Sequence, residues 1–325
     1  MSILITGAGL IGCQTAALLV SRGERVLLLD SNPDPARVAT VLPLDRVALL
    51  RGDIRDRAAM RALFERHAVH AVVHTAAALS LAIREQPSLA ADVNFGGTVN
   101  LLEAACACGL SRFLLASSTT VVYPAFCRPH AAPLAEDFAF HAVSERPGSL
   151  YSASKLASEF FAQLYADRYG LSLAVLRYSA VLGLWAGPNT SVPGRLLARL
   201  LGEGSVNGRV RIDDPLLLWS GGDDFIDARD VARANVAALD APACPSRVYT
   251  IGSGRLERFD DFVSAARRVR PELHHEAVAL PQTGFAGFAH VRDQPFDITR
   301  ARAELGWAPQ HDLEASMRAA LPCLG

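Results

Sequence analysis

The sequence predicts an α/β fold built on a doubly wound parallel sheet, with a smaller lobe contributed mainly by its C-terminal half. Short apolar runs alternate with helix-length amphipathic segments through the first half of the chain, which is typical of parallel strands joined by crossover helices. The runs are almost continuously Val, Ile and Leu, as expected for strands that helices cover on both faces. A chain of 325 residues with 50% hydrophobic side chains can also bury a large core.

The elements follow in order along the chain. Strands are expected at residues 3–6, 25–30, 47–51, 71–75, 112–117, 173–178 and 248–251, and helices at 11–22, 57–67, 91–108 and 150–169. After residue 178 the alternation breaks down at Gly and Pro clusters. We therefore expect an NAD-binding domain at 1–178, to which residues of about 224–253 return, and mainly a substrate-binding lobe at 179–325. The long connection 124–149 is a candidate wall of the substrate pocket or a tolerated surface insertion.

Charge and composition exclude several classes of protein. Lys plus Arg number 32 and Asp plus Glu 33, interspersed, so no basic stripe for nucleic acid is present. No apolar run approaches the length of a membrane span and no signal segment opens the chain, which favours a cytoplasmic protein. The six cysteines form no CxxC pair, and two adjacent histidines have no third ligand nearby, so we expect reduced thiols and no metal site. These residues are Cys13, Cys106, Cys108, Cys127, Cys244, Cys323, His274 and His275.

The first expected strand runs into TGAGLIG, which places Gly7, Gly9 and Gly12 at a strand-to-helix turn. Glycines in a GxGxxG arrangement allow a tight turn and close backbone approach to a pyrophosphate at a helix N-terminus. The second strand ends in Asp30, 23 positions after Gly7, where a carboxylate can accept hydrogen bonds from ribose hydroxyls. The combination predicts a Rossmann-type dinucleotide site.

Asp30 favours NAD over NADP, because a 2'-phosphate would meet a like charge at this position. Arg37 is too distant in sequence to argue strongly for NADP. A helix cap or turn carboxylate is the structural alternative for Asp30. A nucleotide-dependent methyltransferase could show the same glycines and acidic strand end, so the downstream sequence must separate the two classes.

The stretch YSASK, at residues 151–155, ends in the only lysine of the chain, while the remaining 31 cationic side chains are arginine. Lysine is a compact ammonium whose pKa responds to its surroundings, which arginine cannot replace where point-charge chemistry is needed. In a helix, Tyr151 and Lys155 lie one turn apart on the same face. An ammonium near a phenol favours the phenolate, so the pair is a candidate general acid/base for a substrate hydroxyl.

Together with further motifs in a fixed order, these residues resemble an extended short-chain dehydrogenase/reductase of the NAD-dependent epimerase/dehydratase family. The resemblance covers essentially the whole chain, and methyltransferases have no use for a YxxxK pair. The motifs are GDI at 52–54, HTAA at 74–77, NFGGTVNLLEAA at 94–105, SSTTVVY at 117–123, LRYSAVLG at 176–183, DDFIDARDVARA at 223–234, YTIGSG at 249–254 and DITRARAELGW at 297–307.

The resemblance implies a role for each matching position. Tyr151 would be the acid/base, Lys155 the ribose anchor and modulator of its pKa, and Thr119 the hydroxyl that binds the reacting oxygen. Asp53 and Ile54 would flank the adenine, Ala76 and Ala77 the pyrophosphate and ribose, Asn94 the core of the cofactor site, and Tyr178 the nicotinamide. The full expected cofactor set is Gly7, Gly9, Leu10, Ile11, Gly12, Asp30, Ser31, Asp53, Ile54, Ala76, Ala77, Asn94, Ser117, Tyr151, Lys155 and Tyr178, with Ser118, Thr119 and Arg292 expected at the substrate.

The chain departs from the family pattern where substrate is bound. Nucleotide-sugar enzymes of the family usually have asparagine in place of Ala180 and arginine in place of Asp223, and dehydratases have an acidic residue after the catalytic Thr. Asp223 would repel phosphate. Arg292 could bind an anionic group or pair with the neighbouring Asp293. The first two glycines of the turn are also one residue closer than usual.

These features predict an NAD-dependent oxidoreductase that transfers hydride at a secondary alcohol or ketone of a sugar-like or other small hydroxylated substrate, with Tyr151 as acid/base. A nucleotide-sugar epimerase resembling UDP-glucose 4-epimerase, with tightly held NAD, is the alternative. A non-catalytic dinucleotide sensor is a third reading, which the retention of Lys155 disfavours. The expected partners are a small-molecule substrate and a second copy of the chain.

Overall fold

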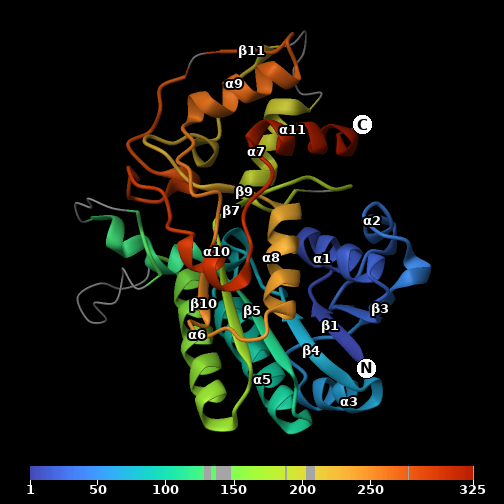
Figure 1. The fold of residues 1–325 in the computed structure, drawn as a ribbon. Helices are drawn as coiled ribbons and strands as arrows, with labels where there is room; N and C mark the ends of the chain where they lie inside the picture. Colours follow the sequence, from blue (N-terminus) through green and yellow to red (C-terminus); the bar gives the residue numbers. More distant parts are fainter. Residues whose placement is uncertain (128–132, 137–147, 187–188, 203–208, 277, 325) are drawn as a thin grey trace.

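A seven-stranded parallel sheet forms the centre of the computed structural model, in the order β10-β6-β5-β4-β1-β2-β3 (Figure 1). The structure describes residues 1–127, 133–136, 148–186, 189–202, 209–276 and 278–324. The strands are β1 (Ser2–Thr6), β2 (Val26–Asp30), β3 (Ala48–Arg51), β4 (Val69–His74), β5 (Arg112–Ser118), β6 (Leu173–Tyr178) and β10 (Val248–Ile251). The predicted fold class and all seven predicted strands are confirmed, with ends shifted by at most two residues.

The sheet is buried on both faces, which explains its continuous apolar strands. Ile3 and Ile5 of β1 pack with α1 (Leu10–Ser21) and α8 (Ala228–Asp240), whereas Leu4 between them packs in a separate cluster with α3 (Arg57–His67), α5 (Gly97–Cys108) and α6 (Leu150–Tyr169). Successive side chains of a strand point to opposite faces, so both layers depend on the same short runs. The two helical layers are visible on either side of the sheet in Figure 1.

The helix expected at residues 91–108 is instead two elements. A π-helical segment, η2 (Ala90–Gly96), leads into α5 at Gly97. The hydroxyls of Thr98 and Ser158 both donate to the carbonyl oxygen of Asn94, at 2.6 and 3.0 Å, inside this segment. A π segment widens the helix locally, and here it lies at a residue predicted for the cofactor site.

The smaller lobe lies beyond one end of the sheet and has a core of its own. Its buried centre is Trp219, whose ring lies 5.1 to 5.5 Å from the rings of Phe225, Phe259, Phe262 and Phe285. Its elements are β7 (Ala180–Leu182), α7 (Val192–Leu201), β8 (Arg209–Val210), β9 (Phe225–Asp227), α9 (Phe259–Val269), β11 (His274–His275) and α11 (Leu313–Ala320). Three further short α-helices are α2 (Pro35–Ala39), α4 (Ser80–Glu85) and α10 (Thr299–Leu305).

The chain crosses between the two parts more than once. After β9, α8 packs against α1, and β10 pairs with β6 at the edge of the main sheet. The expected domain boundary at residue 178 and the expected return of residues near 224–253 to the first domain stay predictions. Most of the predicted pocket wall at 124–149 lies outside the described residues. Among the described residues, no helix is long and apolar enough to cross a membrane.

Candidate active site

The glycine turn lies where the sheet changes winding direction. β1 pairs with β2 on one side and with β4 on the other, so the chain diverges at the carboxyl ends of β1 and β4. Gly7 follows β1 with φ +92°, and a Cβ there would lie 2.8 Å from the backbone nitrogen of Ala76, which follows β4. A Cβ on Gly12 would lie 1.9 Å from the carbonyl oxygen of Gly7. Only glycine fits either position, whereas Gly9 has open space beside it.

This turn fits a dinucleotide. Gly9 is the N-cap of α1, and no side chain accepts a hydrogen bond from the first backbone N–H groups of the helix. A Cβ on Gly9 would meet nothing within 4 Å, so a ligand can approach this end of the helix closely. Such a helix end attracts a pyrophosphate. Leu10 and Ile11 begin this helix, Asp30 is the last residue of β2, and Ser31 follows it.

Asp30 holds the turn with its carboxylate. Oδ2 accepts a hydrogen bond from the backbone N–H of Ala8 at 2.8 Å, and Oδ1 accepts one from Asn32 at 2.9 Å. The turn-carboxylate alternative is therefore partly realised. These bonds leave further lone pairs on both oxygens, because a carboxylate has about four acceptor sites.

Asp53 and Ile54, the residues predicted near the adenine, follow β3 at the same edge of the sheet. Arg55 binds the carboxylate of Asp53 with its guanidinium and backbone N–H, which holds the pKa of Asp53 below its usual range. Ile54 is buried, and a Cβ on Gly97 would lie 2.5 Å from its Cδ1. The small residue at the start of α5 therefore lets Ile54 reach the core.

Asn94 is buried and fastens the segment that follows β4. Its Oδ1 accepts from the N–H of Ala78 at 2.7 Å, and its Nδ2 donates to the carbonyl of Ala78 at 3.1 Å and to Ser154 Oγ at 3.2 Å. Asn94 therefore positions Ala76 and Ala77 relative to α6. Ser154, which carries no signal of its own in the sequence, is the residue of α6 that Asn94 binds.

The candidate catalytic residues lie together at the carboxyl end of β5. Ser149 caps α6 by accepting from the N–H of Ser152, so the helix begins just before Tyr151. Lys155 Nζ lies 5.9 Å from the centroid of the Tyr151 ring and donates to the carbonyl of Ala116 at 2.9 Å. Thr119 follows β5 directly and is buried.

Burial shifts the pKa values of both Tyr151 and Lys155. Burial raises the pKa of Tyr151 to about 12, which the nearby Ser118 hydroxyl only partly offsets. Burial lowers the pKa of Lys155 to about 8, against the opposing attraction of Glu159. In this structure burial outweighs any stabilisation of the phenolate, and the Lys155 ammonium donates to the carbonyl oxygen of Ala116, so the expected effect of Lys155 on the pKa of Tyr151 stays a prediction.

A neutral histidine lies behind this pair. His74, at the end of β4, has Nδ1 2.7 Å from Thr6 Oγ1 and Nε2 2.9 Å from Thr98 Oγ1. Burial and then the charge of Lys155 lower its pKa to about 3. His74 therefore joins β1, β4 and α5 below the site without adding charge to it.

Two predicted cofactor residues direct their hydroxyls into the core. Ser117 Oγ donates to Glu159, which also forms a buried ion pair with Arg177 at 2.6 Å. The Tyr178 hydroxyl donates to Asn235 of α8 at 2.6 Å. The hydroxyls of Ser117 and Tyr178 are therefore occupied by protein partners.

Arg292 lies on the small-lobe side of the site. Its Nη1 donates to Asp223 Oδ1 at 2.7 Å in a buried ion pair, whereas the sequence left open an anionic ligand or a pairing with Asp293. Asp293 is exposed. The acidic residue at position 223 was the only sign of this pair in the sequence, because its partner Arg292 lies 69 positions further along the chain.

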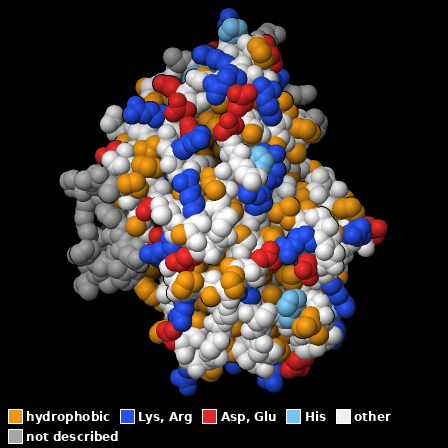
Figure 2. All heavy atoms as spheres, in the orientation of Figure 1, with side chains coloured by type: hydrophobic (Ala, Val, Ile, Leu, Met, Phe, Trp, Pro, Cys, Tyr) orange, Lys and Arg blue, Asp and Glu red, His pale blue; other side chains and the backbone are white. Residues whose placement is uncertain are grey.

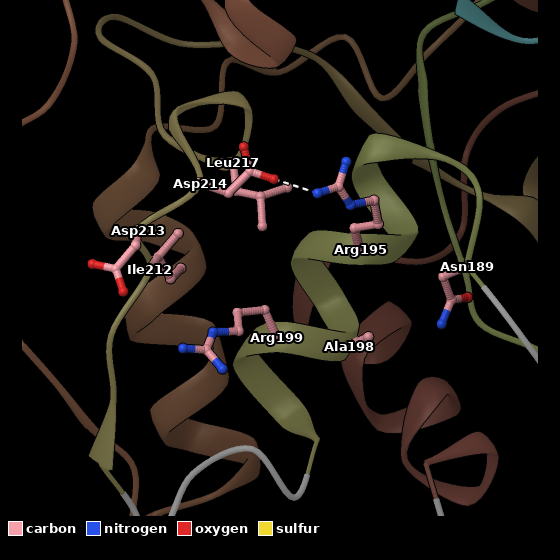
Figure 3. Close-up of a pocket in the computed structure, with 8 residues that line it drawn as sticks. All are labelled: Asn189, Arg195, Ala198, Arg199, Ile212, Asp213, Asp214 and Leu217. Atoms are coloured by element: carbon pink, nitrogen blue, oxygen red, sulfur yellow. Dashed lines mark hydrogen bonds and ion pairs between the residues drawn. The ribbon is translucent and has the colours of Figure 1, made fainter. Parts of the chain in front are cut away.

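A separate hollow of about 450 Å³ lies in the small lobe between α7 and residues 212–217 (Figure 3). Arg195 and Asp214 form an ion pair across it. None of the three candidate catalytic residues lines it.

In the described part of the chain no cluster of three metal-binding side chains occurs. Positive and negative side chains are interspersed over the face shown in Figure 2.

A doubly wound parallel sheet with a glycine turn after its first strand and a helix that carries Tyr-x-x-x-Lys is the arrangement of the extended short-chain dehydrogenases/reductases, and this chain is of that class. The model of the NAD dependent epimerase/dehydratase family matches residues 3–252. The chain belongs to this family and is an NAD-dependent enzyme.

Named relatives and solved structures are similar over almost the whole chain. UDP-glucuronate 4-epimerase 3 of Arabidopsis thaliana is 29% identical over 98% of this chain and 75% of its own length. UDP-glucose 4-epimerase of Corynebacterium glutamicum is 29% identical over 96% of this chain and 92% of its own. The UDP-glucose 4-epimerase of Thermus thermophilus in complex with NAD superposes with a TM-score of 0.80 at 25% identity, over 100% of this chain and 99% of that one.

Proposed function

We propose that the chain is an NAD-dependent sugar epimerase that oxidises a secondary alcohol and reduces it again in place, with Tyr151 as acid/base. The observation that carries this proposal is that Tyr151, Lys155 and Thr119 lie at the carboxyl end of β5, on the same edge of the parallel sheet as the glycine turn after β1. The comparisons support the epimerase alternative better than a dehydrogenase, because the named relatives are 4-epimerases.

Each residue has a defined task in this proposal. A bound NAD would supply the hydride acceptor for oxidation of the substrate carbinol carbon and, once reduced, the hydride donor for the return step. The hydroxyls of Thr119 and Tyr151 contact the reacting oxygen, and Tyr151 takes its proton on oxidation and returns one on reduction. With a pKa near 12 the phenol is protonated at neutral pH, which suits the reductive half of the cycle. The oxidative half needs this pKa lowered, and Lys155 is the nearby cation that can contribute to that shift.

We further propose NAD in preference to NADP. The Asp30 carboxylate at the end of β2 would repel a 2'-phosphate. Arg37, the cation that could counter this repulsion, stacks 4.1 Å over the ring of Trp185 and donates to the carbonyl of Ala186. Its guanidinium is therefore engaged by the small lobe.

A homodimer in the cytoplasm completes the proposal. Phe160, Phe161 and Leu164 of α6 are 41%, 41% and 63% exposed, although all are large and apolar. A contiguous apolar stripe of this kind is typical of a surface covered by another chain. The described cysteines are free thiols, which agrees with a reducing compartment.

The test is to incubate the purified protein with UDP-glucose, UDP-glucuronate and the corresponding free sugars, and to separate the products by chromatography. The proposal predicts conversion to the 4-epimer without accumulation of reduced cofactor. A dehydrogenase that releases an oxidised product is the second candidate, which the acid at Asp223 favours because it disfavours a nucleotide diphosphate. Stoichiometric reduction of added NAD, without an epimer, would support that candidate instead.

A further inference from the structure

The Asp223–Arg292 ion pair lies next to the candidate catalytic residues. Both side chains are buried, with exposed fractions of 6% and 4%. The guanidinium carbon of Arg292 lies 3.9 Å from the ring centroid of Phe296. Phe296 packs in one buried cluster with Tyr123, which follows Thr119 by four residues in η3 (Thr119–Cys127). The Tyr123 side chain hydrogen-bonds both Thr119 and Arg292, so a substrate held at Thr119 would lie near this ion pair.

Backbone hydrogen bonds fix the pair in place. The N–H of Gly222 donates to the carbonyl of Arg292 at 3.0 Å, and the N–H of Asp224 donates to Asp223 Oδ1 at 2.7 Å. The backbones of Asp223 and Glu257 bond in both directions, at 3.0 and 2.8 Å. Arg292 cannot turn towards another anion without leaving the Asp223 carboxylate buried and unpaired, which is strongly unfavourable.

The local balance of charge is also unfavourable for an anion. Asp224 is buried beside Asp223, and its carboxylate accepts from the N–H groups of Ser253 and Gly254 at 2.7 and 2.9 Å. Two buried carboxylates therefore surround one guanidinium. In surroundings of low dielectric, a phosphate group would experience a net repulsion here.

We propose that Asp223 determines the substrate class by neutralising Arg292, so that the enzyme takes a sugar or polyol without a phosphate at this position. This inference rests on the proposed function and narrows its substrate. The proposed substrate differs from the ligand of a solved relative, the UDP-glucose 4-epimerase of Thermotoga maritima, whose structure contains UDP-glucose. Asp223 is a specificity residue and takes no part in proton or hydride transfer.

The experiment is a calorimetric titration of the NAD-loaded protein with UDP, which reports binding without turnover. We expect the wild-type protein to bind UDP weakly, and Asp223→Asn to bind it at least about tenfold more tightly, because the variant exposes the phosphate to the charge of Arg292. The matched control is Asp293→Asn, which removes the same charge from an exposed neighbour of Arg292 and is expected to change UDP affinity less than twofold.

Strong UDP binding by the wild-type protein, unchanged in Asp223→Asn, would overturn the inference. If Asp223→Asn does not fold, the wild-type titration still decides, since micromolar UDP affinity contradicts a neutralised arginine. Equal gains in Asp223→Asn and Asp293→Asn would also contradict it, because they would reflect net charge alone. Absence of epimerase activity would instead refute the proposed function and leave this titration unaffected.

Discussion

At the scale of single residues, the proposed chemistry depends on the phenol of Tyr151. Tyr151→Phe removes the proton donor and keeps the ring, so we expect turnover to fall by about 10² to 10⁴, the usual contribution of a general acid/base. Dinucleotide content should be unchanged. The control is Tyr169→Phe, an exposed phenol on the same helix, which should leave turnover unaltered. Full activity in Tyr151→Phe would refute the assignment.

The lowered pKa of Lys155 has a consequence for stability. The group titrates near pH 8 in the folded chain and near 10.5 when unfolded. Between these values the unfolded chain binds more protons, so the stability of the wild-type protein rises with pH. Against Lys155→Met, the difference in free energy of unfolding between pH 7 and pH 10 should amount to about 2 kcal/mol. Denaturant unfolding of the dinucleotide-free proteins measures it, and parallel pH profiles would contradict the shift.

The residues to which we assign the proposed chemistry stand out in the sequence by their spacing. The glycine turn and YxxxK pair are local patterns, so their positions follow from the elements that carry them. The Asp223–Arg292 pair could not be predicted, because its partners come from distant segments and the nearer Asp293 is the obvious candidate. The pKa of Tyr151 also escaped prediction, since it depends on how deeply the fold buries the ring.

At the scale of elements, α6 is fastened to the sheet through Glu159, which binds Arg177 of β6 and Ser117 of β5. Glu159→Gln should lower the free energy of unfolding by about 3 kcal/mol, because it leaves a buried guanidinium without its carboxylate. The control is Glu65→Gln in the exposed Arg61–Glu65 pair, expected to cost under about 0.5 kcal/mol. Equal losses of stability, measured by denaturant unfolding, would contradict this account of α6.

The elements of the main sheet were predictable because each strand is an apolar run long enough to stand out. Those of the small lobe were not, since β7, β8, β9 and β11 have only two or three residues each. Such strands are stabilised by distant contacts, here the packing around Trp219. The π segment at Asn94 likewise depends on hydrogen bonds from separate elements.

At the scale of the whole molecule, the exposed apolar stripe on α6 predicts a dimer. Leu164→Glu places a charge in the stripe and should weaken association at least about tenfold, because the carboxylate would be buried in the dimer. Size-exclusion chromatography with light scattering measures the mass. Leu44→Glu, at an exposed leucine remote from α6, is the control. A monomeric wild-type protein would contradict the prediction.

The most direct test of the central claim is the dinucleotide released when freshly purified protein is denatured, identified by mass and reduction state. An epimerase returns its cofactor to the starting state in each cycle, so the account predicts close to one NAD per chain and no NADP. A protein that carries NADP would contradict the assignment of Asp30. A protein that carries none, and takes up added NAD only reversibly, would contradict epimerisation in place and favour a dehydrogenase.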